Sequence, residues 1–69
     1  MTKKGGYINM REVICVSERL SEYNMIQKGC HYLIRLDTLY SFNGDWYVDV
    51  YNMEKVRLGS YKLNHFMDT

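Results

Sequence analysis

The 69-residue chain has no proline and only two cysteines, and its charges nearly cancel. Nine Lys and Arg side chains stand against eight Asp and Glu side chains, which leaves a net charge of +1. The strong positive field that drives non-specific binding to nucleic acid is therefore absent. A chain of this length holds a single hydrophobic core, which excludes a multidomain protein.

The cysteines do not form the closely spaced pair that marks zinc and redox sites. A zinc site built from Cys15, Cys30, His31 and His65 is the alternative. Because Cys30 and His31 are adjacent, they would point to opposite faces of a strand. The first residues carry charge without a following apolar run, unlike a signal peptide. We therefore expect a cytoplasmic protein with two buried, reduced thiols and no metal, cofactor or membrane segment.

Ten aromatic residues and runs of β-branched residues favour strands over helices. Residues 1–9 are polar and contain glycine, which indicates a flexible N-terminal arm before one domain of residues 10–69. The first strand is expected at residues 11–17, covered on both faces. Further strands are expected at residues 30–36, 46–51, 56–61 and 66–67.

Turn signals separate these strands. Asn43-Gly44 predicts a tight hairpin turn, since both residues tolerate positive φ. Residues 62–65 predict a single 3₁₀ turn before the last strand. Tyr32, Ile34 and Leu36 are expected on one face of their strand and His31, Leu33 and Arg35 on the other. Trp46, Val48 and Val50 are likewise expected to share one face.

The order of these landmarks resembles that of a Src-homology-3 domain. The resemblance is carried by Ile26-Gln27-Lys28-Gly29, Asn43-Gly44-Asp45-Trp46-Tyr47-Val48 and Gly59-Ser60-Tyr61-Lys62-Leu63-Asn64-His65-Phe66. It spans about Val13 to Met67 and is nearest to small barrel proteins of bacteria and phages. It implies an all-β, five-stranded barrel with a short 3₁₀ turn before the last strand.

The resemblance also implies a peptide groove over Trp46. Leu63 and Phe66 match the positions where the family has a proline and a tyrosine. Leu63 departs from that pattern, so the same surface is open to a ligand other than a proline-rich peptide. Trp46 is either an anchor at the rim, as the resemblance implies, or a cap on the core, because it is in phase with Val48 and Val50.

We therefore expect a protein-binding module, an adaptor or inhibitor of phage or prophage origin that acts on a host protein. Exposed aromatic and apolar side chains would contact the partner while two acids steer its approach. The expected contact residues are Tyr23, Trp46, Leu63, Phe66, Glu18 and Glu22. A second, mixed patch is expected from His31, Arg35, Tyr47 and Tyr51, although cross-strand pairing alone would explain it.

Two alternatives remain open. Arg11, Arg35 and Arg57 could gather on the outer surface with tyrosines and bind single-stranded nucleic acid, although the acids dilute their charge. Self-pairing through an exposed strand edge is the other, so we expect a monomer or a weak homodimer. Catalysis has the least support, because His31 and His65 have no recognisable nucleophilic partner.

Overall fold

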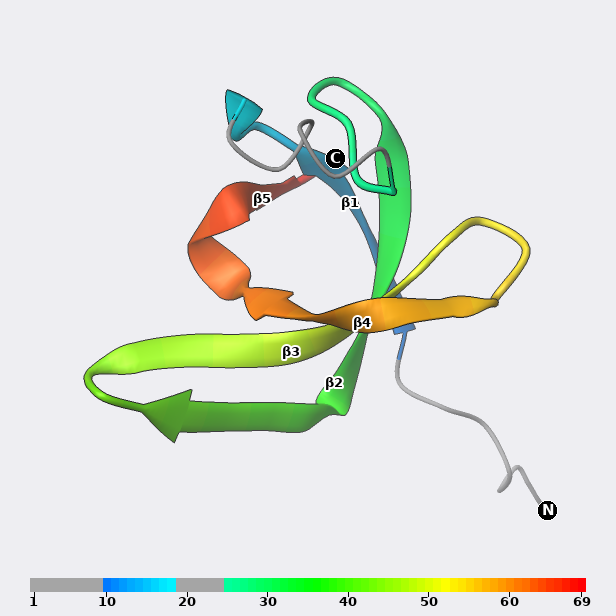
Figure 1. Cartoon of the computed structure of the whole chain (residues 1–69). Coiled ribbons are helices and arrows are strands. Elements are labelled where there is room, and N and C mark those ends of the chain that lie inside the picture. Colours follow the sequence, from blue (N-terminus) through cyan, green and yellow to red (C-terminus); the bar gives the residue numbers. More distant parts are fainter. Residues whose placement is uncertain (1–9, 19–24) are drawn as a thin grey trace, which may run out of the picture.

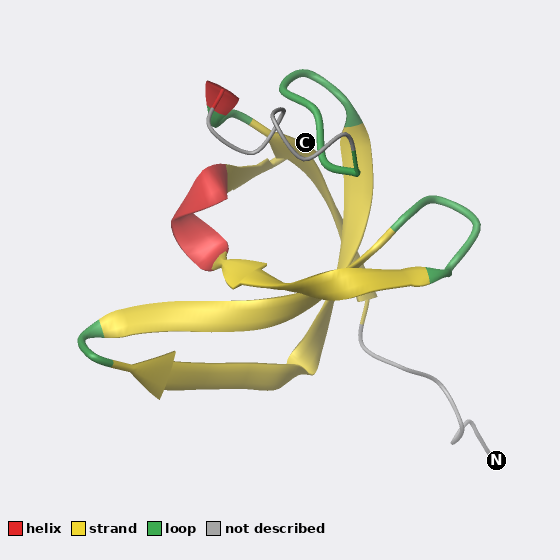
Figure 2. Cartoon of the chain, in the orientation of Figure 1, coloured by secondary structure: helices red, strands yellow, loops and turns green. Residues whose placement is uncertain are grey.

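The computed structural model describes residues 10–18 and 25–69, and all of its strands belong to one sheet. The strands are β1 (Met10–Cys15), β2 (His31–Phe42), β3 (Asp45–Tyr51), β4 (Arg57–Lys62) and β5 (Phe66–Asp68). A 3₁₀ helix of a single turn, η2 (Leu63–His65), connects β4 to β5 (Figures 1 and 2). The predicted all-β class, the five strands and the 3₁₀ turn are confirmed, and the predicted arm of residues 1–9 lies outside the described residues.

The sheet is antiparallel throughout and has the strand order β4-β3-β2-β1-β5. The sheet is strongly curved, which brings its two edge strands, β4 and β5, near enough to be connected by η2 (Figure 1). Among the described strands no hydrogen-bonded ladder joins β4 to β5. The sheet is therefore open, and the barrel closure expected from the sequence is not seen.

One face of the sheet, which we call the inner face, carries the core. Tyr32 and Ile34 on β2 and Val48 and Val50 on β3 are buried, whereas the residues between them are more exposed. This confirms the predicted alternation for these two strands. The core is completed by Val13, Cys15, Ile26 and Phe66.

The opposite, outer face lies towards solvent. On β1, Val13 and Cys15 of the inner face are buried, whereas Glu12 of the outer face is exposed and Ile14 is partly exposed. The expectation of a first strand covered on both faces is therefore wrong, because the outer face of β1 reaches solvent. The expectation of two buried thiols is also wrong, since Cys30 is exposed at the end of the loop that precedes β2.

The described end of the long β1–β2 connection is tied to the core. Ile26 is fully buried, and the backbone N–H of Gln27 donates to the phenol oxygen of Tyr32 at 2.7 Å. The N–H of Gly29, which has φ +87°, donates to the carbonyl of Cys15 at 2.8 Å. These contacts hold the loop against the end of β1 and the beginning of β2.

β2 is longer than predicted and changes register halfway. Arg35 pairs with Asp49, but the next pair is Tyr40 with Tyr47, so four residues of β2 oppose one residue of β3. The Thr38 hydroxyl bridges this shift: it donates to the carbonyl of Arg35 at 2.6 Å and accepts from the N–H of Asp49 at 2.9 Å. The side chain thereby takes the place of ladder hydrogen bonds that the bulge removes.

Beyond this shift, β2 and β3 continue as a hairpin whose end projects at one side of the molecule (Figure 1, left). We call residues 39–47 the hairpin tip. Asn43 and Gly44 form its two-residue turn, with φ values of 52° and 82°. Both values are positive, as a type I′ turn requires, so the predicted turn is confirmed.

Candidate functional site

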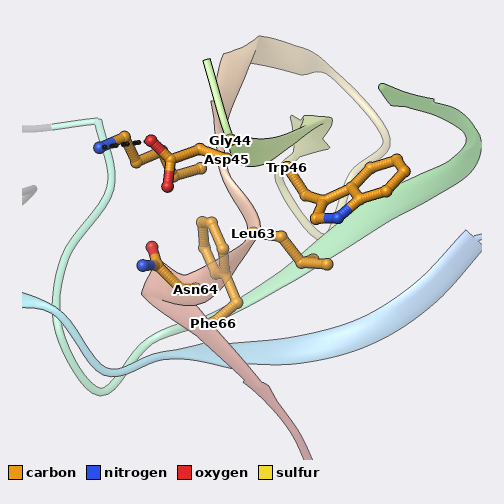
Figure 3. A pocket seen from close by; sticks show the side chains of 7 residues that line it. Gly44, Asp45, Trp46, Leu63, Asn64 and Phe66 are labelled. Atoms are coloured by element: carbon orange, nitrogen blue, oxygen red, sulfur yellow. Dashed lines mark ion pairs between the residues drawn. The ribbon is translucent and has the colours of Figure 1, made fainter. Parts of the chain in front are cut away.

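Three of the side chains selected from the sequence lie around one hollow in the surface. Trp46 from the hairpin tip, Leu63 from η2 and Phe66 from β5 line a cavity of about 350 Å³ (Figure 3). Gly44, Asp45, Lys62 and Asn64 complete its lining. We call this hollow the Trp46 pocket. Its volume falls at the lower end of the range of roughly 300–1,000 Å³ that is typical of ligand sites.

The strand alternation explains how Trp46 reaches the pocket. Trp46 is in phase with the buried Val48 and Val50, so its indole belongs to the inner face. At the hairpin tip the core has ended, and 53% of Trp46 remains exposed. Of the two positions that the sequence left open, the indole therefore occupies the rim rather than capping the core.

Phe66 and Leu63 form the apolar wall beside Trp46. Phe66 is buried and meets the ring of Tyr32 edge-on, at a centroid distance of 6.3 Å and an angle of 74°. Leu63 is partly buried and packs against the core. In Figure 3 both side chains lie between the Trp46 indole and Asn64. Because the core holds this wall in place, the pocket needs little rearrangement to accept an apolar group.

The remaining lining is polar and charged. The ammonium of Lys62 lies 3.4 Å from a carboxylate oxygen of Asp45, the ion pair marked by the dashed line in Figure 3. Both side chains reach solvent, so this pair contributes little to stability. Asn64 is also exposed. The Trp46 pocket thus combines an apolar wall with a rim that offers one positive and one negative group.

Of the two acids and the tyrosine expected to contact the partner from the long loop, the structure describes Glu18 alone. Glu22 and Tyr23 lie outside the described residues. Glu18 is exposed and forms an ion pair with Lys28 at 3.7 Å, and it is not among the residues that line the pocket. Of the described residues expected to contact a partner, Trp46, Leu63 and Phe66 lie together and Glu18 lies apart from them.

The second expected patch is brought together in part on the outer face, where Arg35 and Tyr51 share a side-chain hydrogen bond. A ring nitrogen of His31, Nδ1, lies 2.7 Å from a carboxylate oxygen of Glu12 on β1. Arg35 instead contacts both carboxylate oxygens of Asp37, at 2.7 and 3.2 Å. The hydrogen bond to Asp37, and in second place the one to Tyr51, raises the pKa of Arg35 above its ordinary value. Each charged member of the patch already has a partner within the sheet.

Tyr47 belongs to an aromatic cluster that the sequence reasoning missed. Its ring stacks on Tyr40 at a centroid distance of 5.5 Å and meets Phe42 edge-on at 6.5 Å. Tyr40 is 48% exposed and Phe42 is 60% exposed. We call these three residues the aromatic patch. Its only sequence signal was the aromatic content of residues 40–47, because the register shift that brings the rings together leaves no local mark.

The arginines considered for nucleic-acid binding are all paired. The pairs are Arg11 with Asp68 at 3.4 Å, Arg35 with Asp37 at 2.7 Å and Arg57 with Asp49 at 3.1 Å. Arg11 also lies opposite the buried Ile34, on the inner face. The expectation that the three arginines gather on the outer surface is therefore wrong, because β1 turns Arg11 to the other side of the sheet.

Metal ligands, membrane-spanning helices and relatives among known proteins were each sought for this chain. In residues 10–18 and 25–69, no three His, Cys, Asp or Glu side chains are grouped as metal ligands would be. No helix within those ranges has the length and apolar character needed to cross a membrane. No protein-family model, curated protein or solved structure matches the chain. What the protein binds must therefore be inferred from its own residues.

Proposed function

We propose that the protein is a small protein-binding module, an adaptor or inhibitor, that holds an extended segment of its partner in the Trp46 pocket. The observation that carries this proposal is the convergence of Trp46, Leu63 and Phe66, from three separate elements, on one open hollow. The strand order and the place of η2 before the last strand support the resemblance to Src-homology-3 domains. That resemblance implies a peptide groove at these positions.

The chemistry of the lining suggests what the partner presents. An exposed indole supplies a large apolar area and one hydrogen-bond donor, the combination found at binding hot spots. The apolar wall of Leu63 and Phe66 suits an aliphatic or aromatic side chain, and the Asp45–Lys62 pair suits a polar or charged flank. We therefore expect the bound segment to insert one apolar side chain beside Trp46 and to place a charged residue next to it.

The experiment starts from a library of random linear peptides selected against the full chain. An enriched peptide is synthesised, and its Kd is measured for the wild type, Trp46→Ala and the control Phe42→Ala. Phe42 is an exposed aromatic residue of the same hairpin but does not line the pocket. Loss of a hot-spot tryptophan costs at least ~2 kcal/mol, so Trp46→Ala should weaken binding about 30-fold or more. Phe42→Ala should change the Kd by less than about twofold.

Three results would contradict the proposal: no peptide is enriched, the peptide binds Trp46→Ala as tightly as the wild type, or both variants lose binding equally. Thermal unfolding of each variant shows that the fold is intact. Because Trp46 and Phe42 are both exposed, neither substitution should lower stability by more than about 1 kcal/mol. The arginine–carboxylate pairs give no support to nucleic-acid binding, and that function is not proposed.

A further inference from the structure

Among the residues that the structure describes, the outer half of β2 (residues 36–42) has a strand neighbour on one side only. β1 pairs with β2 as far as Arg35, whereas β3 continues along it to Phe42. From Leu36 to Phe42, no described strand occupies the side of β2 opposite to β3. An unpaired strand edge of this kind presents backbone donors and acceptors that can pair with another strand.

The hairpin geometry determines which backbone groups lie on this free edge. Phe42 and Asp45 flank a two-residue turn, so they form a hydrogen-bonded pair, and the next pair, Ser41 with Trp46, does not. The N–H and C=O of Ser41 therefore point away from β3. By the same alternation, those of Leu39 also point to the free edge.

The free edge carries no charge that would repel a second copy of itself. Residues 38–42 contain no ionisable acid or base apart from the tyrosine phenol, and no proline. The acid just before them, Asp37, is paired with Arg35 at 2.7 Å. Natural edges are commonly protected by lysine, proline or inward-pointing charges. In a two-fold symmetric pair each residue meets residues of the same segment, so an uncharged edge is the type that pairs with its own copy.

We propose that the protein forms a two-fold symmetric dimer through antiparallel pairing of the outer halves of two β2 strands. The register follows from the free groups: Ser41 pairs with Leu39 of the second copy, and Leu39 with its Ser41. Tyr40 then lies opposite Tyr40 of the second copy, at the symmetry axis. Two hydrogen-bonded residue pairs supply roughly four backbone hydrogen bonds, and the two sheets become one.

The aromatic patch favours this register. Tyr40 stacks on Tyr47 and is 48% exposed, while Phe42 is 60% exposed. In a non-hydrogen-bonded pair the facing side chains approach most closely, so the two copies of Tyr40 would join the two patches into one row of rings. The dimer thus covers apolar surface that a monomer leaves in water. The area is well below the ~1,600 Å² of a standard interface, so we expect a Kd of roughly 10 μM to 1 mM.

Sedimentation equilibrium over a range of protein concentrations tests the dimer. Ser41→Pro removes the free-edge N–H and leaves the β3 ladder intact, since this N–H does not bond to β3. Tyr40→Lys places two like charges at the symmetry axis. Both variants should raise the dimer Kd at least about tenfold. Met53→Lys, an exposed residue in the β3–β4 turn, is the control for added charge and should dimerise like the wild type.

The proposal is overturned if the wild type remains a monomer up to about 1 mM, or if Ser41→Pro and Tyr40→Lys both dimerise like the wild type. Circular dichroism and unfolding curves show whether each variant is folded. Hydrogen exchange at the Ser41 amide adds a second measurement. Protection that rises with protein concentration supports the dimer, whereas protection independent of concentration would mean that another part of the same chain covers the edge, which overturns it.

The dimer and the peptide site can fail separately. The Trp46 pocket opens on the inner face, whereas the dimer uses the free edge and the outer face of the same hairpin. Trp46→Ala should therefore abolish peptide binding and leave the dimer mass unchanged. Tyr40→Lys should abolish the dimer and leave the peptide Kd within about twofold of the wild type.

Discussion

Replacing Thr38 by valine removes the hydroxyl that bridges the register shift in β2 while keeping the shape of the side chain. The N–H of Asp49 and the carbonyl of Arg35 would each lose a hydrogen-bond partner, at 2.9 and 2.6 Å respectively. A buried polar group without a partner costs about 1–3 kcal/mol. Because this site is only half-buried, water compensates in part, and we expect a total loss of about 1–3 kcal/mol. A chain of 69 residues has a stability of roughly 3–10 kcal/mol, so the loss is large.

Urea unfolding measures this effect directly. With a slope of about 1 kcal/mol per molar urea for a small domain, the midpoint of Thr38→Val should fall by about 1–3 M at an unchanged slope. Thr38→Ser keeps the hydroxyl and should lower the midpoint by less than about 0.5–1 M. If valine and serine at this position shift the midpoint equally, the hydroxyl does not replace the ladder hydrogen bonds and the reasoning fails.

Two further substitutions test the packing of the inner face. Gly59→Ala should lower the free energy of unfolding by about 1–3 kcal/mol, because φ is +151° and a Cβ would lie 3.1 Å from the Tyr61 ring; an unchanged Tm beside the control Ser60→Ala would contradict this. Burial raises the pKa of Tyr32 above 10.0 in the folded chain, so the unfolded chain loses this proton first. Stability is therefore retained below about pH 10 and falls as the pH rises through the raised pKa. Tyr32→Phe should flatten this fall in urea titrations between about pH 9 and 11, and equal slopes would refute the assignment.

The parts of the fold that could be predicted are those with local causes. Tyr32 and Ile34 share one face of β2, and Val48 and Val50 share one face of β3, because side chains two residues apart on a strand point to the same side. The turn at Asn43 follows from the tolerance of Asn-Gly for positive φ. These features depend only on residues that are neighbours in the chain, so they can be predicted from the sequence.

The parts that could not be predicted depend on distant contacts. Nothing near Thr38 marks a bulge, since its hydroxyl acts only once Asp49 lies beside it. The exposure of Cys30 depends on where the long loop leaves the core, and the face on which Arg11 lies depends on the pairing of β1 with β2. For Trp46, the face of β3 on which it lies was predictable from the strand period. Its exposure was not, because that depends on how far the core extends along the hairpin.

The register shift in β2 also explains why this small sheet has two candidate binding surfaces. If the alternation of Ile34 continued along β2, Tyr40 and Phe42 would face inward, on the same side of the sheet as Trp46. The shift moves the pairing by an odd number of residues, which turns both rings to the outer face with Tyr47. Across from Trp46 the strand then presents only the small side chain of Ser41. One irregularity, bridged by a single hydroxyl, thus leaves the Trp46 pocket open and creates the aromatic patch.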